Sequence, residues 1–368
     1  MNQQQVRTMF GELVKEPQAP STVDVGRAVR DGRRHRRTRR LLECGAVVAA
    51  AGLILGGVGL LGGRTPRPVT VAAPDRFDPM TRYADFGWLP SRLGERSVFI
   101  QPEHLTLEAS VPGVEPTVRP VSRVAVVLYP AGKQPGANVV EDLPWPLEGG
   151  CRSDDGTTAP MVGGRQARWA YPRAIGGERC DPTAVELRWQ YAPGAWAVAR
   201  TARLTPGDGD PRSVVRRVAQ TLRLGVNESL RVPFRAGFVP PGLQPAGSIE
   251  RGDPGSARWS VNINLEARTS SADGNKPRRS AIAAIPAASH FPMDKSEPLN
   301  TTVDGHRAYR RTLKNSLETT EILRVAGVHG FVFRIETSGV GHSAPERILR
   351  GLTVLGTDGT AWTSRPFE

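Results

Sequence analysis

A stretch of twenty residues without a charged side chain, residues 44–63, constrains this chain more than any other feature of its sequence. A helix of that length extends about 30 Å, the thickness of the hydrocarbon core of a bilayer. An arginine cluster precedes it and consists of Arg33, Arg34, Arg36, Arg37, Arg39 and Arg40. Because positive charge gathers on the cytoplasmic side of membrane helices, the pattern predicts a signal anchor. The expected location is the cell membrane, crossed once, with a cytoplasmic N-terminus and an extracytoplasmic C-terminal region.

Two other interpretations of this segment stay open. A cleaved signal peptide needs a small-residue cleavage site, and residues 71–73 are a poor one behind an unusually long leader. The string at residues 38–42 has a weak twin-arginine pattern, which any dense basic run contains easily. Gly52 and Gly56 also have the spacing that lets membrane helices approach closely. A segment this rich in glycine contains such pairs by chance.

The positive charge of the chain is concentrated at its N-terminus. The formal net charge is +13, and residues 1–40 hold ten basic and four acidic residues. A basic run directly before an apolar segment is better explained by membrane orientation than by phosphate binding, so we expect no nucleic-acid partner. Residues 1–40 are too short to bury a core. They are expected either to lie as a solvated leader beside the membrane or to bind a cytoplasmic protein.

Two similar halves follow a Pro-rich linker at residues 64–80. The first half opens with Phe-Gly-Trp-Leu-Pro at residues 86–90, and the second with Gly-Phe-Val-Pro-Pro-Gly-Leu at residues 237–243. A V-x-G-x-x-A pattern recurs at residues 162–167 and 303–308. The shared order of these elements predicts a duplication whose loops have changed in length.

Each half also closes with an amphipathic pattern of helical period, at residues 211–224 and 345–355. The predicted fold class is therefore α+β, with two tandem antiparallel-sheet modules that each end in a C-terminal helix, preceded by one transmembrane helix. The expected organisation is a basic cytoplasmic segment at 1–40, a transmembrane helix at 41–63, the linker at 64–80, extracytoplasmic modules at 81–228 and 229–358, and a tail at 359–368.

The order of an aromatic–Leu–Pro opening, a V-x-G turn, strands and a Pro-initiated helix resembles a small domain of unknown function. That domain occurs at the extracytoplasmic end of some bacterial anti-sigma factors, and here it is similar to two copies within residues 80–356. Residues 1–63 resemble actinobacterial membrane proteins that accompany extracytoplasmic-function sigma factors. The resemblance implies a sigma factor as cytoplasmic partner. The zinc anti-sigma motif, His-x3-Cys-x2-Cys, is absent, because no cysteine precedes Cys44.

No pattern of catalytic or metal-binding residues stands out. The six histidines are dispersed and form no H-E-x-x-H pair at helical spacing; they are His35, His104, His290, His306, His329 and His342. No nucleophile elbow or phosphate-binding loop is present. The sequence predicts a non-enzymatic protein without metal or cofactor and indicates no ligand-binding residues.

Two functions remain after these exclusions. The first is a membrane-spanning regulator or sensor, whose tandem repeats bind an envelope ligand and whose leader acts on a cytoplasmic sigma factor. The alternative is a membrane-anchored envelope protein that binds a lipid or cell-wall ligand without signalling.

Cys151 and Cys180 both fall in the first predicted module and are expected to form a disulfide. The bridge would close a loop of about 29 residues and stabilise the fold by about 3.5 kcal/mol in the chain-entropy description. Thiol labelling of the unfolded, unreduced protein should therefore leave both cysteines unmodified, while Cys44 reacts. Labelling of both would contradict the pairing.

Overall fold

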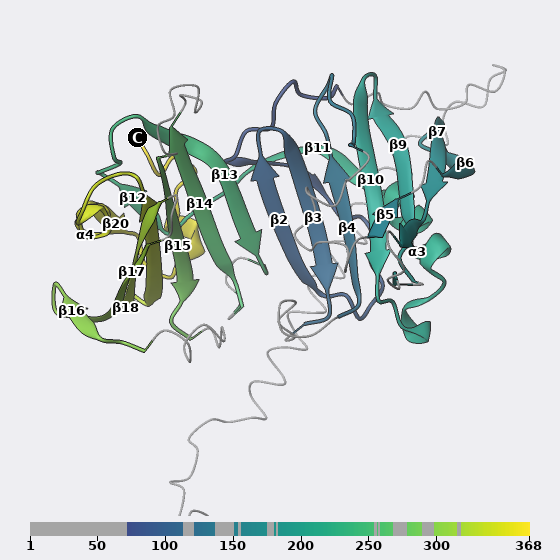
Figure 1. Ribbon diagram of the computed structural model, residues 1–368. Coiled ribbons are helices and arrows are strands. Elements are labelled where there is room, and N and C mark those ends of the chain that lie inside the picture. The colour runs from purple at the N-terminus through teal and green to yellow at the C-terminus, as the bar shows by residue number, and fades with distance from the viewer. Residues whose placement is uncertain are drawn as a thin grey trace, which may run out of the picture. The chain divides into compact units, whose positions relative to one another are not determined.

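The computed structural model describes most of the chain from residue 72 onward (Figure 1). The chain divides into two compact units, Met1–Arg67 and Pro68–Glu368, and everything below belongs to the second unit. The described residues are 72–112, 121–136, 151–153, 156–174, 180–181, 183–253, 256, 258–267, 278–288, 298–314 and 318–368.

One antiparallel sheet of fourteen strands contains most of the described strands, in the order β16-β17-β18-β19-β15-β14-β13-β2-β3-β4-β10-β9-β7-β6. Its first half comprises β2 (Glu95–Gln101), β3 (His104–Ser110), β4 (Arg123–Leu128), β6 (Thr157–Val162), β7 (Arg165–Ala170), β9 (Glu186–Ala192) and β10 (Ala195–Ala202). Its second half comprises β13 (Leu243–Arg251), β14 (Ser260–Ala267), β15 (Arg279–Pro286), β16 (Thr301–Val303), β17 (His306–Lys314), β18 (Thr319–Val328) and β19 (Phe331–Ser338).

Short elements complete the described structure. The two-stranded sheets are β1 (Thr81–Asp85) with β11 (Arg223–Ser229), β5 (Cys151–Ser153) with β8 (Pro172–Ala174), and β12 (Phe234–Ala236) with β20 (Leu352–Val354). The helical elements are η2 (Pro206–Asp208), α3 (Pro211–Thr221), α4 (Ala344–Arg350) and η5 (Gly359–Ala361).

Counted outward from the neighbouring strands β2 and β13, both halves of the large sheet have the same order of connection. Each V-x-G sequence forms the turn of the outermost hairpin, β6–β7 or β16–β17. Gly163 and Gly164 have φ of 56° and 77°, and Asp304 and Gly305 have 48° and 81°. A two-residue hairpin turn that matches the strand twist needs positive φ at both central positions, which explains the glycine in each copy.

The predicted fold class is wrong, because the two halves do not close as separate modules with C-terminal helices. Strand β13 pairs with β2 over four residue pairs, from Ser248↔Ile100 to Arg251↔Ser97, so the strands form one continuous sheet. The strand patterns alone did not reveal this pairing. A strand has the same alternation of apolar and polar residues whether it lies at the edge of a sheet or is paired on both sides. The predicted module boundaries, 81–228 and 229–358, stay predictions.

The predicted single-pass membrane topology is corrected as well. Within the part of the chain that the structure describes, no helix combines the length and the apolar character needed to cross a bilayer. The predicted transmembrane helix at 41–63 and the arginine cluster before it lie outside the described residues. Length and lack of charge were the basis of that prediction, and neither is sufficient to establish a membrane helix.

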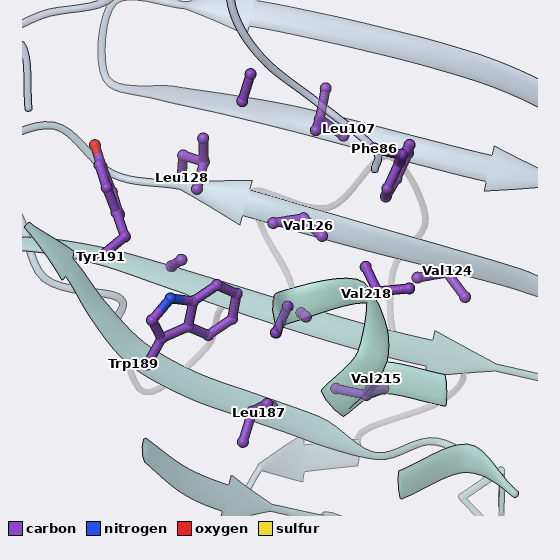
Figure 2. Close-up of a cluster of buried hydrophobic side chains, with 14 of the residues drawn as sticks. Phe86, Leu107, Val124, Val126, Leu128, Leu187, Trp189, Tyr191, Val215 and Val218 are labelled. Carbon is purple, nitrogen blue, oxygen red and sulfur yellow. The ribbon is translucent and has the colours of Figure 1, made fainter. Parts of the chain in front are cut away.

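Alternating residues of the strands build the core of the first half, and α3 covers them (Figure 2). Val215 and Val218 of α3 belong to the same cluster of buried side chains as Leu187 and Trp189 of β9. Asp210 begins the helix, since its carboxylate accepts a hydrogen bond of 2.9 Å from the Ser213 amide. A second core in the other half contains Phe234, Trp259, Ile263, Phe331, Phe333, Ile335 and Ile348.

A buried carboxylate beside the β2–β13 pairing holds the β1–β11 ribbon to the sheet. Glu250 of β13 is 5% exposed, and its Oε2 accepts a hydrogen bond from the guanidinium of Arg82 on β1. Its Oε1 accepts a hydrogen bond of 3.3 Å from the indole of Trp259. Arg82 also lies 3.6 Å from the exposed carboxylate of Glu228. Removing one partner of a buried pair leaves the other charge without compensation.

Glu250→Gln is therefore expected to lower the free energy of unfolding by about 3 kcal/mol, measured by urea denaturation. Glu228→Gln is the matched control, because that side chain is 65% exposed and should change stability by less than about 1 kcal/mol. Equal effects of the two substitutions would contradict this role of Glu250.

Candidate functional site

A pocket of about 320 Å³ opens at one end of the second half of the sheet, beside the loop that joins β19 to α4. It is lined by Lys314, Glu318, Thr319, Glu321, Thr337, Gly339, Val340, Gly341 and His342. We call it the Glu321 pocket. Its volume lies at the lower end of the range for small-molecule sites.

The strand register places Glu321 on the core-facing side of β18. Glu321 pairs with Thr312 of β17 and Thr337 of β19, so the three side chains share one face. Leu323 and Val325, two and four residues further along β18, are 1% and 0% exposed. Glu321 thus continues an apolar row toward the strand end and is itself only 6% exposed.

The loop after β19 brings a histidine over this carboxylate. Gly339 and Gly341 have φ of 68° and 90°, a region that L side chains rarely adopt, so the chain reverses tightly above the strand ends. Ser343, the residue before α4, also has a positive φ of 61°, which is strained for a residue with a Cβ. The Nδ1 atom of His342 lies 2.8 Å from Glu321 Oε1.

The second carboxylate oxygen of Glu321 has no hydrogen-bond partner in the described part of the chain, although the atom is buried. The His342 ring on the other side is 87% exposed, so it leaves the pocket open to solvent. An unpaired buried acceptor destabilises a protein by about 1–3 kcal/mol, and more when it is charged. An ammonium or guanidinium group of a ligand would satisfy this oxygen, and Lys314 in the same lining would attract a carboxylate.

A second hollow, of about 340 Å³, meets the first at Thr337. Several of its lining residues lie on the opposite face of the sheet, because they are offset by one position from Glu321 and Thr337. Here Thr320 and Ser338 form a hydroxyl–hydroxyl hydrogen bond of 2.7 Å. The remaining lining residues are Asn264, Leu265, Glu266, Arg279, Ser280, Ala281 and Glu336.

A different polar cluster crosses the non-core face of the first half. Arg200 of β10 lies 3.5 Å from Glu186 Oε1, and Arg188 donates a hydrogen bond of 2.9 Å to Glu186 Oε2. Glu108 of β3 lies in the same row across the sheet, two strands from Arg200. Burial raises the pKa of the Glu108 carboxyl to about 7, against an opposing attraction from Arg123. None of the pockets described above is lined by these residues.

None of the sequence-predicted site residues that the structure describes lines the Glu321 pocket. Cys180 is disulfide-bonded, whereas the side chain of Cys151 is not among those the structure describes, so their pairing stays a prediction. The orientation arginines lie outside the described residues, as stated above. In the described ranges, no three His, Cys, Asp or Glu side chains gather as metal ligands.

Sequence patterns did not single out Glu321 or His342. One signal was available, because the alternation along β18 puts Glu321 in the same register as the apolar Leu323 and Val325. An acid on the apolar side of a strand indicates either a buried partner or a ligand site. The contact with His342, twenty-one residues later, depends on the loop conformation and has no local signal.

Comparisons with known proteins give a weak structural similarity only. No protein-family model and no curated protein sequence matches the chain. One solved structure, of MucB in complex with MucA(peri), has 11% identity and a TM-score of 0.22, covering 72% of this chain and 94% of that one. Another, of the Pseudomonas aeruginosa MucA/MucB complex, has 12% identity and a TM-score of 0.21, with the same coverage. Of the predicted anti-sigma resemblance, only this weak similarity to MucB is observed.

The raised pKa of Glu108 predicts a pH dependence of stability. The folded state favours the protonated carboxyl, so the stability that it contributes is fully present below pH 4.5 and is lost as the pH rises through about 7. Relative to Glu108→Gln, the wild-type free energy of unfolding should fall by up to about 3 kcal/mol over that interval.

Urea denaturation at a series of pH values measures this difference. Glu103→Gln serves as the control, because that carboxylate is 52% exposed and should leave the pH profile of the wild type unchanged. A parallel profile for wild type and Glu108→Gln would contradict the burial of an ionisable Glu108.

Proposed function

We propose that this chain is a non-enzymatic regulatory protein that binds a small zwitterionic ligand, of the size and chemistry of an amino acid, in the Glu321 pocket. The observation that carries the proposal is Glu321 Oε2, a buried carboxylate oxygen that lines a pocket and has no hydrogen-bond partner among the described residues. The ligand ammonium group replaces the missing partner, and its carboxylate faces Lys314.

The surroundings of His342 support binding over catalysis. Its Nδ1 is committed to Glu321, and no hydroxyl or thiol of a described residue hydrogen-bonds to the ring. General-base catalysis on a protein nucleophile needs such a group within reach. The His342–Glu321 pair instead fixes one carboxylate oxygen and leaves the other for a ligand.

The regulatory part of the proposal rests on the sequence resemblance to anti-sigma-associated domains. In its finer form, residues 1–40 contact an extracytoplasmic-function sigma factor, and ligand binding at the Glu321 pocket changes that contact. Co-purification of the full chain with its cognate sigma factor tests this form. Deletion of residues 2–30 should abolish co-purification, and an unchanged yield would contradict it.

Thermal shift and calorimetry with the twenty free amino acids test the ligand class. A binder is expected to raise the melting temperature, and N-acetylation of that binder should abolish the shift because it removes the ammonium charge. Glu321→Gln should weaken binding at least about tenfold, since a hydrogen bond to a charged group contributes about 1.5–3 kcal/mol. Lys314→Gln should weaken binding of the free acid more than that of its amide.

Glu336→Gln is the matched control, because Glu336 lines the hollow on the other face of the sheet. This variant should bind the ligand with the affinity of the wild type. Absence of any binder, or equal affinity in Glu321→Gln and wild type, would overturn the ligand assignment.

A further inference from the structure

Strand β17 has an open edge beyond its short neighbour β16. The pairing of β16 extends only from Thr301↔Ala308 to Val303↔His306. Beyond this pairing, the side chain of Asn300 accepts a hydrogen bond of 2.9 Å from the backbone amide of Arg310 and donates one of 3.0 Å to its backbone carbonyl. The five residues of β17 from Arg310 to Lys314 are all exposed.

Backbone groups of alternate residues point to the same side of a strand. Since the amide and carbonyl of Arg310 point toward Asn300, those of Thr312 and Lys314 point to the same open side. Within the described ranges, no strand pairs with β17 on this side beyond Ala308. Unpaired backbone donors and acceptors at a sheet edge form a template for another strand.

The opposite edge of the sheet is protected in a way that β17 is not. Strand β6 carries Pro160, which has no amide hydrogen, and its pairing with β7 is irregular between Ala159 and Val162. Strand β17, in contrast, pairs with β18 without interruption from Ala308↔Val325 to Lys314↔Thr319. Its edge is therefore straight enough to accept a partner.

The side chains along this edge are basic and partly apolar. Arg307, Arg311 and Lys314 form no ion pair with a described residue, whereas Arg310 lies 2.8 Å from the Glu346 carboxylate. No acidic residue occurs in β17. Leu313, at 39% exposure, is one of two large apolar side chains that are exposed among the described residues. Because Arg311 and Leu313 lie on the same face of the strand, they complement an extended segment that carries an acidic and an apolar residue two positions apart.

We infer that the β17 edge from Arg310 to Lys314 binds an acidic, extended segment of another protein by strand addition. Five residues in a strand span about 17 Å, which is the length of a short linear motif. Backbone hydrogen bonds to Thr312 and Lys314 hold the segment. Arg307 and Arg311 select its acidic side chains, and Leu313 contacts an apolar one.

The side chains that select the partner point away from the Glu321 pocket, and only Lys314 belongs to both, through its side chain at the pocket and its backbone at the edge. Arg311 and Leu313 pair with Ile322 and Thr320, so their side chains lie on the sheet face opposite to that of Glu321. Partner binding at Arg311 can consequently be tested without altering the pocket.

Fluorescence anisotropy with the full chain tests the inference. The probe is a fluorescein-labelled peptide of repeated Glu-Thr-Val-Thr, which presents glutamate and valine in turn on one face of the strand, and the comparison peptide has lysine in place of glutamate. The acidic peptide should bind at low salt, and the basic one should not. Arg311→Glu should weaken binding at least tenfold. Arg216→Glu is the control, because it reverses the charge of an exposed residue on α3, and this variant should bind the acidic peptide as the wild type does.

Hydrogen exchange separates strand addition from a diffuse charge attraction. The amides of Thr312 and Lys314 should gain protection when the acidic peptide binds. Thr312→Pro should abolish peptide binding while circular dichroism stays unchanged, because the lost amide faces the open side. Binding without protection of these amides, equal binding by Arg311→Glu, or no binding of the acidic peptide would each overturn the inference. The last result would mean that the charges only prevent self-association of the edge.

Discussion

The pairing of β2 with β13 is the interaction on which the rest of this structure depends. Four residue pairs at this junction turn two seven-stranded arrays into one sheet, and the shared order of connection continues outward from it. Glu250 lies at the junction and also binds Arg82 of the β1–β11 ribbon. The junction buries two strand edges that would otherwise expose unpaired backbone groups, which leaves β6 and β16–β17 as the outer edges.

The two candidate binding surfaces both lie near the β16–β17 edge of the sheet, and each contains polar groups without a partner among the described residues. Glu321 has one carboxylate oxygen bonded to His342 and one without a hydrogen-bond partner, and no described strand pairs with the backbone groups of Thr312 and Lys314 on the outer side of β17. Buried carboxylate oxygens without a hydrogen-bond partner also occur elsewhere in the described residues, at Glu108, Glu186, Asp208 and Glu346, but none of these residues lines a pocket described above. An unsatisfied polar group reduces stability, so one that lines an open pocket favours a role in binding.

Local features of the fold were accessible from the sequence. The glycines in the V-x-G turns adopt the positive φ that such hairpins need, and α3 lies within the range 211–224 expected to be helical. The second helix is shorter than its pattern suggested, since it ends at Arg350, and the next residue, Gly351, packs so closely on Phe238 that an added Cβ would lie 2.8 Å from the Phe238 Cβ. Residues Leu352–Val354, expected to be helical, form β20 and pair with β12. The helical period would have extended α4 by only about one turn, and the pairing of β20 with β12 prevailed over it.

The sequence by itself determined the turns, the strand alternation and the duplication of their order, because these depend on φ preferences and on the spacing of apolar residues along the chain. Only the tertiary structure decided that the halves share one sheet, since every strand edge has the same backbone chemistry and selects its partner through contacts distant in sequence. It also decided which buried carboxylate lines a pocket with one oxygen left without a hydrogen-bond partner among the described residues. Glu321 acquires its pocket only when the 339–342 loop folds over the strand ends, and no residue near it in sequence encodes that contact.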